Sequence, residues 1–195
     1  MRGKVTLKPE ELIKGCIQGN RQAQNNFYNK YSSLLFGITL RYAKNRTDAE
    51  DILQESFIKI FKYLKDFRAD GALEGWMRRI IVTTAFNFYK RKSHINSNIE
   101  PEHVRIPITG DNEVVSKMSH DELLDIISGL PNGYRMVFNM NTFEGYSHKE
   151  IGEMMNISVN TSKSQLSRAK SSLQKTITTL FKVEEQKIHL SMVAC

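Results

Sequence analysis

Apolar residues recur every three or four positions over long stretches of the chain, a pattern that predicts amphipathic helices. The first such stretch covers residues 21–44, where the repeating positions are Phe27, Tyr31, Leu34, Leu35, Ile38 and Tyr42. A second helix is predicted to begin at Thr47, because residues 47–50 have the form of a capping box. Its apolar stripe comprises Leu53, Phe57, Ile60, Phe61 and Leu64.

A third helix is predicted over about residues 73–92, with an inner face of Met77, Ile80, Ile81, Thr84 and Phe88. The single tryptophan, Trp76, is expected to lie in the core. No stretch alternates polar and apolar residues as a half-buried strand would. The pattern therefore predicts an all-α fold.

The helical pattern stops between residues 93 and 117, where apolar residues are sparse and Pro101, Pro107 and Gly110 interrupt a polar stretch. Such a segment buries too little apolar surface to offset chain entropy, so we expect a linker. Helical spacing resumes at Asp121, and Pro131 suits the first turn of another helix. The sequence thus predicts two small helical domains joined by a flexible linker.

A helix-turn-helix is predicted within residues 146–173, where two helix starts fall about eleven residues apart. Residues 147–150 form a capping box that opens a short helix, with Ile151, Met154 and Met155 inward. Asn156 can end that helix in the left-handed conformation, and Ser158 can cap the next one. The inner face of the second helix is predicted to be Val159, Ser162, Leu166, Ala169 and Leu173.

The outward face of this second helix carries short polar side chains, a long arginine and a flanking lysine: Asn160, Thr161, Ser164, Arg168 and Lys163. Such a face suits reading of the DNA major groove by hydrogen bonds. A solvated helical hairpin is the alternative.

The charge distribution points to a polyanionic partner. The chain of 195 residues has a formal net charge of +7, and residues 78–92 and 159–182 each carry five basic residues and no acid. The partner would be nucleic acid or an anionic membrane surface. A membrane is disfavoured because the helical faces are already used by the core and no apolar run is long enough to span a bilayer. No secretion signal opens the chain, so we expect a cytoplasmic protein.

Catalysis and metal binding find no support in the sequence. Cys16 and Cys195 lie at opposite ends of the chain, and the five histidines are scattered. There is no paired carboxylate, nucleophile elbow, phosphate loop or metal-ligand spacing. We therefore expect no enzyme activity, cofactor, metal or small-molecule substrate.

Residues 130–173 resemble the second DNA-binding domain, region 4, of bacterial sigma factors. The resemblance rests on Leu-Pro at 130–131, Arg-Met-Val-Phe at 135–138, Glu-Gly-Tyr-Ser at 144–147, Lys-Glu-Ile at 149–151 and Thr-Ser-Lys-Ser-Gln-Leu-Ser-Arg-Ala at 161–169. Departures from the family pattern are Gly152 for Ala, Asn160 for Gly and Gln165 for Arg.

Residues 22–92 resemble region 2 of the same family, which unrelated helix-turn-helix regulators lack. The matching blocks are Phe-Tyr-Asn-Lys-Tyr at 27–31, Asp-Ala-Glu-Asp-Ile-Leu-Gln-Glu-Ser-Phe at 48–57, Trp-Met-Arg-Arg-Ile at 76–80 and Tyr-Lys-Arg-Lys at 89–92. Thr83 replaces a usual Asn, and Asn87 a usual Asp. Together the two regions resemble an extracytoplasmic-function (ECF) sigma factor of the sigma-70 family.

The resemblance implies a factor that recruits core RNA polymerase to promoters and promotes DNA melting, without catalysis of its own. It implies a region 2 domain at 5–92, a linker at 93–117, a region 4 domain at 118–182 and a tail at 183–195. The linker would thread toward the polymerase active cleft or serve as a mere tether. The resemblance also implies an anti-sigma factor as a further partner. The rival interpretation is a helix-turn-helix regulator that acts without core polymerase.

The resemblance also implies three binding surfaces. The clamp coiled coil of core polymerase would be met by Asp51, Gln54, Glu55 and Ile58, although a merely solvated face has the same pattern. Minus-ten DNA would be met by Arg78, Arg79, Thr83, Phe86, Asn87, Lys90 and Arg91, with Phe86 either stacking on a base or packing on another helix. The loop at residues 66–73 would hold a flipped base. Minus-thirty-five DNA would be met by Ser158, Asn160, Thr161, Lys163, Ser164, Gln165 and Arg168, the last touching either a base or a phosphate.

Overall fold

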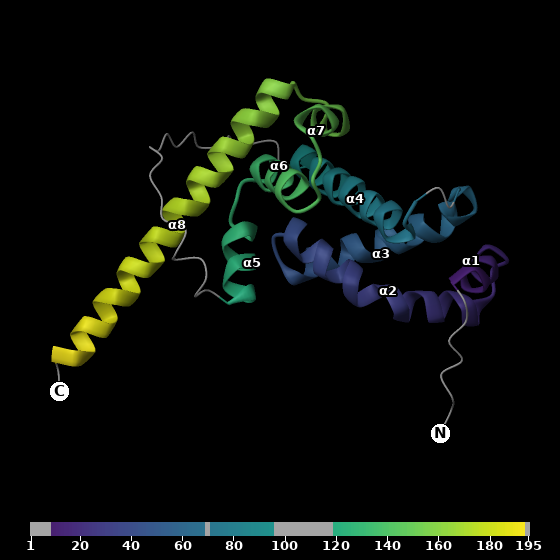
Figure 1. Ribbon diagram of the computed structural model, residues 1–195, viewed down its shortest axis with the longest axis horizontal. Coiled ribbons are helices and arrows are strands. Elements are labelled where there is room, and N and C mark those ends of the chain that lie inside the picture. Colours follow the sequence, from purple (N-terminus) through teal and green to yellow (C-terminus); the bar gives the residue numbers. More distant parts are fainter. Residues whose placement is uncertain (1–8, 69–70, 96–118, 194–195) are drawn as a thin grey trace. The chain divides into compact units, whose positions relative to one another are not determined.

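The structure, a computed structural model, describes residues 9–68, 71–95 and 119–193, and every regular element among them is helical (Figure 1). The elements are α1 (Pro9–Ile17), α2 (Arg21–Tyr42), α3 (Arg46–Tyr63), the 3-10 turn η1 (Leu64–Asp66), α4 (Leu73–Ile95), α5 (His120–Ser128), α6 (Asn132–Thr142), α7 (His148–Met155) and α8 (Val159–Val193). The predicted all-α fold is confirmed.

The chain divides into two compact units, residues 1–90 and 91–195. Most of the predicted linker lies outside the described residues. The helix α4 continues to Ile95, three residues beyond the predicted end.

The first unit packs α2 and α3 against each other and against α4 around an apolar core. The fully buried residues at its centre are Phe27, Leu35, Ile38, Tyr42, Ile52, Ile60, Leu64, Met77 and Ile81. The predicted stripes are confirmed for most positions, but Leu34 is 41% exposed. Leu34 and Leu35 are about 100° apart on the helix, and Leu35 is the one that turns into the core.

The helix α4 is buried over a wider arc than predicted. Met77, Ile81 and Thr84 are buried as expected, and so are Val82, Ala85 and Tyr89, whereas Ile80 and Phe88 are half-buried. Trp76 was expected in the core, and this prediction is wrong. Its ring is half-buried and packs at 5.5 Å, centroid to centroid, on Phe67 at the edge of the unit.

The start of α3 differs from the predicted capping box at Thr47. The cap is Asn45, whose Oδ1 accepts a hydrogen bond of 2.8 Å from the Asp48 amide. Asp48 is itself buried, and its carboxylate accepts a hydrogen bond of 2.8 Å from the Tyr89 hydroxyl. That hydroxyl accepts one of 2.7 Å from the Lys44 amide. This buried chain of bonds ties the α2–α3 turn to α4, so Thr47 falls in the first turn of the helix instead of capping it.

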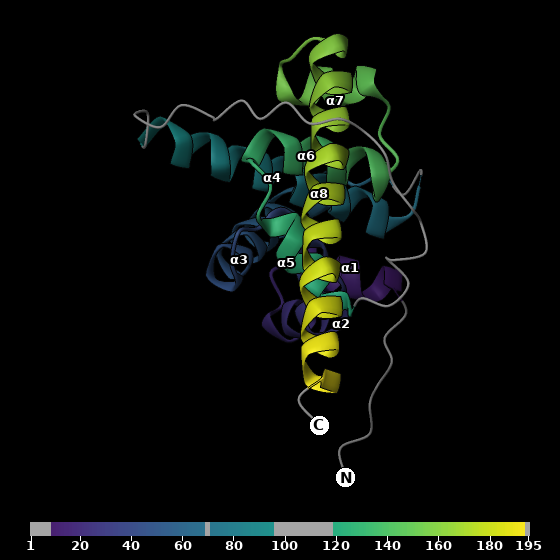
Figure 2. The ribbon, with the colours of Figure 1, turned by 90° about the vertical axis from the view of Figure 1, so that its left-hand side faces the viewer.

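The second unit, seen from another side in Figure 2, is built from α5 to α8. Arg135 of α6 is fully buried, and its guanidinium donates to the carbonyls of Ser128 and Leu130, each at 2.8 Å, and to Oδ1 of Asn132 at 2.9 Å. It therefore holds the α5–α6 turn in place. Pro131 immediately precedes the first residue of α6, where its carbonyl accepts the first helical hydrogen bond.

The helix-turn-helix forms as predicted. Ser147 and Glu150 make the capping box of α7, and Asn156 ends that helix in the left-handed conformation at φ 55°. A Cβ on Gly152 would lie 2.8 Å from the Ile157 carbonyl oxygen, so glycine in place of the family's usual alanine suits the close turn of this chain. On α8, Ser162, Leu166, Ala169 and Leu173 are buried as expected.

Two features of α8 differ from expectation. Val159, the first residue of the helix, was predicted to be buried but is 40% exposed. The helix itself continues to Val193, through most of the residues predicted as a tail.

Candidate functional site

The outer surface of α3 carries three exposed candidates for partner binding. Asp51, Gln54 and Ile58 point away from the core, and Ile58 is 63% exposed. Beside Gln54 and Ile58 is a hollow of about 430 Å³, floored by Leu53 and Phe57. An exposed aliphatic side chain next to an apolar hollow and an acidic residue suits docking of a protein partner.

Glu55, the fourth candidate on α3, is engaged within the domain. Its carboxylate lies 2.9 Å from Nζ of Lys59, and both side chains are about three-tenths exposed. Nζ of Lys59 also donates to Oγ1 of the buried Thr84 on α4, at 3.2 Å. Glu55 therefore helps to fix α3 against α4, a role that the sequence pattern did not indicate.

The outward face of α4 is basic. Arg79, Thr83, Lys90 and Arg91 are exposed, whereas Arg78, Phe86 and Asn87 are half-buried. The Thr83 hydroxyl donates to the Arg79 carbonyl one turn earlier. A half-buried aromatic side chain among exposed cations suits stacking on an unpaired base, with the cations available to phosphates.

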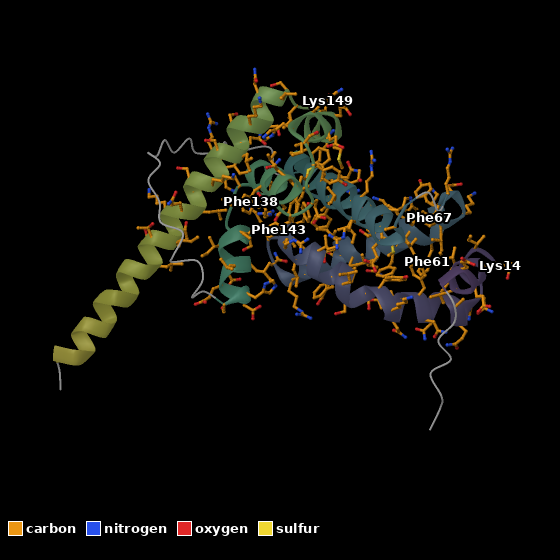
Figure 3. The ribbon with its side chains drawn as sticks, in the orientation of Figure 1. Lys14, Phe61, Phe67, Phe138, Phe143 and Lys149 are labelled. Atoms are coloured by element: carbon orange, nitrogen blue, oxygen red, sulfur yellow. The ribbon has the colours of Figure 1, made fainter. Side chains whose placement is uncertain are left out.

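An aromatic pair lies beside the loop at residues 66–73. Phe67 and Trp76 are both half-buried, with their rings tilted by 47° (Phe67 is labelled in Figure 3). Residues 69 and 70 of this loop lie outside the described part of the chain. The sequence alone did not pair the two rings, because eight residues, including a turn, lie between them.

The hydroxyl groups at the start of α8 form hydrogen bonds with groups of the same helix turn. Ser158 caps the helix by accepting from the Thr161 amide at 3.0 Å, and the two hydroxyls share a hydrogen bond of 2.8 Å. The Ser164 hydroxyl donates to the Thr161 carbonyl at 2.9 Å. These bonds fix the three side chains at the start of the helix. Asn160 and Lys163 are exposed on the same face.

The two remaining candidates on α8 contact α6. Gln165 is half-buried beside Gly133, and Oε1 of Gln165 is buried without a hydrogen-bond partner. Arg168 is exposed, and its Nη1 lies 3.4 Å from the Tyr134 hydroxyl. Both candidates thus lie on the helix face expected to meet DNA or at its edge, and each has a neighbour in the first turn of α6.

A hydrogen bond joins α7 and α8, the two helices of the helix-turn-helix, and the sequence pattern did not predict it. Nδ1 of His148, at the start of α7, lies 2.9 Å from Oγ of the fully buried Ser162 on α8. It joins the two helices near the end that would face DNA. A serine on the inner stripe of α8 was the signal for a polar partner.

Catalytic and metal chemistry gain no support from the described residues. Burial raises the pKa of the Cys16 thiol to about 11, which keeps it a neutral and poor nucleophile. Among residues 9–68, 71–95 and 119–193, no three His, Cys, Asp or Glu side chains come together in a way that could hold a metal ion. No helix in these ranges is long and apolar enough to cross a membrane.

The chain is similar to known sigma factors in both units. Residues 27–95 match the family model described as Sigma-70 region 2, and residues 120–173 match that of Sigma-70, region 4. The chain is 30% identical over 182 residues to the ECF RNA polymerase sigma-E factor of Haemophilus influenzae, covering 88% of this chain and 96% of that protein. It is 26% identical over 185 residues to the RNA polymerase sigma-H factor of Pseudomonas aeruginosa, with coverage of 89% and 95%.

Among solved structures, the fold resembles the sigma factor RpoE from Bartonella quintana, which was crystallised in complex with the anti-sigma factor NepR. The TM-score is 0.52 at 16% identity, covering 78% of this chain and 97% of that chain. The chain belongs to the sigma-70 family of RNA polymerase sigma factors and, within it, to the ECF subfamily. It is a DNA-binding transcription initiation factor with both a region 2 and a region 4.

Proposed function

We propose that this chain recruits core RNA polymerase to its promoters through three separate surfaces of the two units. The observation that carries the proposal is the coexistence, in one chain, of a basic α4 face with an exposed acidic and apolar α3 face. A regulator acting alone needs the helix-turn-helix but has no use for the α3 surface. The functional domains would cover residues 5–92 and 118–182, with a linker at 93–117 and a tail at 183–195.

The α3 surface docks on the polymerase clamp. Asp51 and Gln54 supply complementary charge and hydrogen bonds, and Ile58 with the hollow beside it supplies the apolar anchor. Glu55 is bound in an ion pair with Lys59, so its main effect is to fix α3, the helix that carries Asp51, Gln54 and Ile58.

The α4 face binds the minus-ten element. Arg78, Arg79, Lys90 and Arg91 bind phosphates, Thr83 and Asn87 offer hydrogen bonds, and Phe86 stacks on an unpaired base. Phe67 and Trp76 lie beside the loop where a flipped base would enter.

The α8 helix reads the minus-thirty-five element from the major groove. Asn160, Lys163, Ser164 and Gln165 lie in the first turns, which approach base edges in helix-turn-helix proteins. Ser158 and Thr161 are positioned by the cap for phosphate or base contacts, and Arg168 lies one turn further along.

An anti-sigma factor is the proposed regulatory partner, by analogy with the related fold crystallised in such a complex. The factor acts in the cytoplasm, where the polymerase is, and has no catalytic activity of its own. It needs no cofactor or small-molecule substrate.

Promoter binding with and without core polymerase tests the proposal. In a gel-shift titration, the chain alone should bind promoter DNA weakly, and addition of core enzyme should give a specific shifted complex. Tight and specific binding without core enzyme would favour the rival function, a helix-turn-helix regulator.

A further inference from the structure

The first turn of α6 lies against the helix that reads DNA in the proposed function. In the second unit α6 packs on α8. The residues that meet there are neighbours on each helix. Gly133 and Tyr134 are consecutive on α6, whereas Gln165 and Arg168 lie one turn apart on α8, and both are candidate DNA contacts.

Tyr134 restrains Arg168. The Tyr134 hydroxyl, on a half-buried ring, accepts a hydrogen bond of 3.4 Å from Nη1 of the exposed Arg168. A free arginine side chain samples many rotamers and loses that freedom when it binds a base or a phosphate. Holding the guanidinium before DNA arrives lowers this loss and selects which groups it can reach.

Gly133 makes room for Gln165. A Cβ at position 133 would lie 3.3 Å from Nε2 and 3.4 Å from Oε1 of Gln165, closer than such atoms usually approach. The amide therefore rests on the bare backbone of α6. Its Oε1 is buried and has no hydrogen-bond partner, so an amide that turns out of this position toward a base edge would gain a hydrogen bond that it lacks without DNA. Glutamine offers both a donor and an acceptor, as bidentate reading of adenine requires.

We propose that the first turn of α6, through Gly133 and Tyr134, sets the sequence preference of α8 by positioning Gln165 and Arg168. Both are positioning residues that need not touch DNA themselves. The inference rests on the proposed role of α8 in reading the minus-thirty-five element, and it adds a determinant outside the helix-turn-helix.

Two conservative variants separate this role from a general effect on folding. Tyr134→Phe keeps the ring and removes only the hydroxyl. Gly133→Ala should favour the helix while it displaces Gln165, because alanine has the higher helix propensity. Matched controls are Tyr63→Phe and Gly37→Ala in the first unit, where a Cβ on Gly37 would meet nothing within 4 Å. Thermal unfolding of all four should show a folded second unit.

The measurement is transcription from a promoter library randomised near minus thirty-five, with core polymerase present. Tyr134→Phe should change the preference by about twofold to tenfold at the base pairs that Arg168→Ala affects. Gly133→Ala should do so at those that Gln165→Ala affects. Tyr134→Phe should have no further effect when Arg168 is already alanine.

The proposal is overturned if either α6 variant leaves the preference unchanged, weakens all sequences alike, or acts equally without its partner on α8. If Arg168→Ala and Gln165→Ala also leave the preference unchanged, the proposed reading role of α8 fails as well. If those two variants change the preference and the α6 variants do not, only the positioning role fails.

Discussion

At the scale of single residues, the fold depends on a few buried polar groups whose partners are spread along the chain. Arg135 is the clearest case, since its guanidinium is wholly buried and satisfies three acceptors around the α5–α6 turn. Its removal would leave buried carbonyls without donors, and each such loss costs about 1 to 3 kcal/mol.

Arg135→Met should therefore destabilise the second unit by on the order of 3 kcal/mol, since methionine fills the space but donates nothing. Urea unfolding followed by circular dichroism would measure the change. Lys170→Met on the exposed surface of α8 is the control and should cost less than about 0.5 kcal/mol. A loss below about 1 kcal/mol for Arg135→Met would mean that the turn is held by other contacts.

The sequence predicted most buried side chains because helical spacing alone determines which positions share a face. It could not predict how much of each helix surface the neighbouring elements cover, so Leu34 and Val159 were wrongly predicted to be buried. Trp76 was misplaced for a related reason, since size and apolarity favour burial but its ring lies at the edge of the unit on Phe67. The contact of Gln165 with Gly133 depends on how two helices pack, and no spacing in the sequence encodes it.

At the scale of the elements, helix existence was predictable, whereas helix ends depended on which competing polar side chain takes the cap. Both Asn45 and Thr47 are favourable capping residues in the sequence. The buried hydrogen bond from Tyr89 to Asp48 fixes the turn so that Asn45 takes the role. In α7 the predicted box of Ser147 and Glu150 forms.

Asn45→Ala should therefore destabilise the first unit by about 1 kcal/mol, whereas Thr47→Ala should have almost no effect. The pair is a matched test, because both changes remove a polar side chain near the same helix start. Chemical unfolding of the two variants would give the difference. Equal losses of stability, or a larger loss for Thr47→Ala, would indicate that Thr47 caps α3 as the sequence predicted.

At the scale of the whole molecule, polymerase binding and DNA binding are proposed for different helices, α3 for the polymerase and α4 and α8 for DNA. Asp51 gives the cleaner test of the polymerase-binding face. Reversal of Glu55 would place a lysine beside Lys59 and disturb α3 itself. Asp51→Lys should weaken binding to core polymerase on the order of tenfold while leaving helicity unchanged.

The control for this variant is Glu153→Lys, which makes the same charge change at an exposed position on α7. It should bind core enzyme as tightly as the parent. If Asp51→Lys and the parent bind core polymerase with equal affinity in a fluorescence titration, the α3 surface is not part of the interface with the polymerase.

The basic face of α4 predicts a salt effect. Arg79→Ala combined with Lys90→Ala should flatten the salt dependence of binding to a fork-junction promoter, by about 0.7 to 0.9 in slope for each lost phosphate contact. Holoenzyme carrying the double variant should also show lower permanganate reactivity in the melted region. An unchanged slope with unchanged reactivity would exclude this face as the minus-ten contact.

Run-off transcription with purified core polymerase on genomic fragments tests the central claim most directly. We expect that addition of the chain produces discrete transcripts whose start sites share a minus-ten and a minus-thirty-five element. Core enzyme alone should give none of them. If no specific transcript appears while the chain alone binds the same fragments tightly, promoter recruitment of polymerase is not its function.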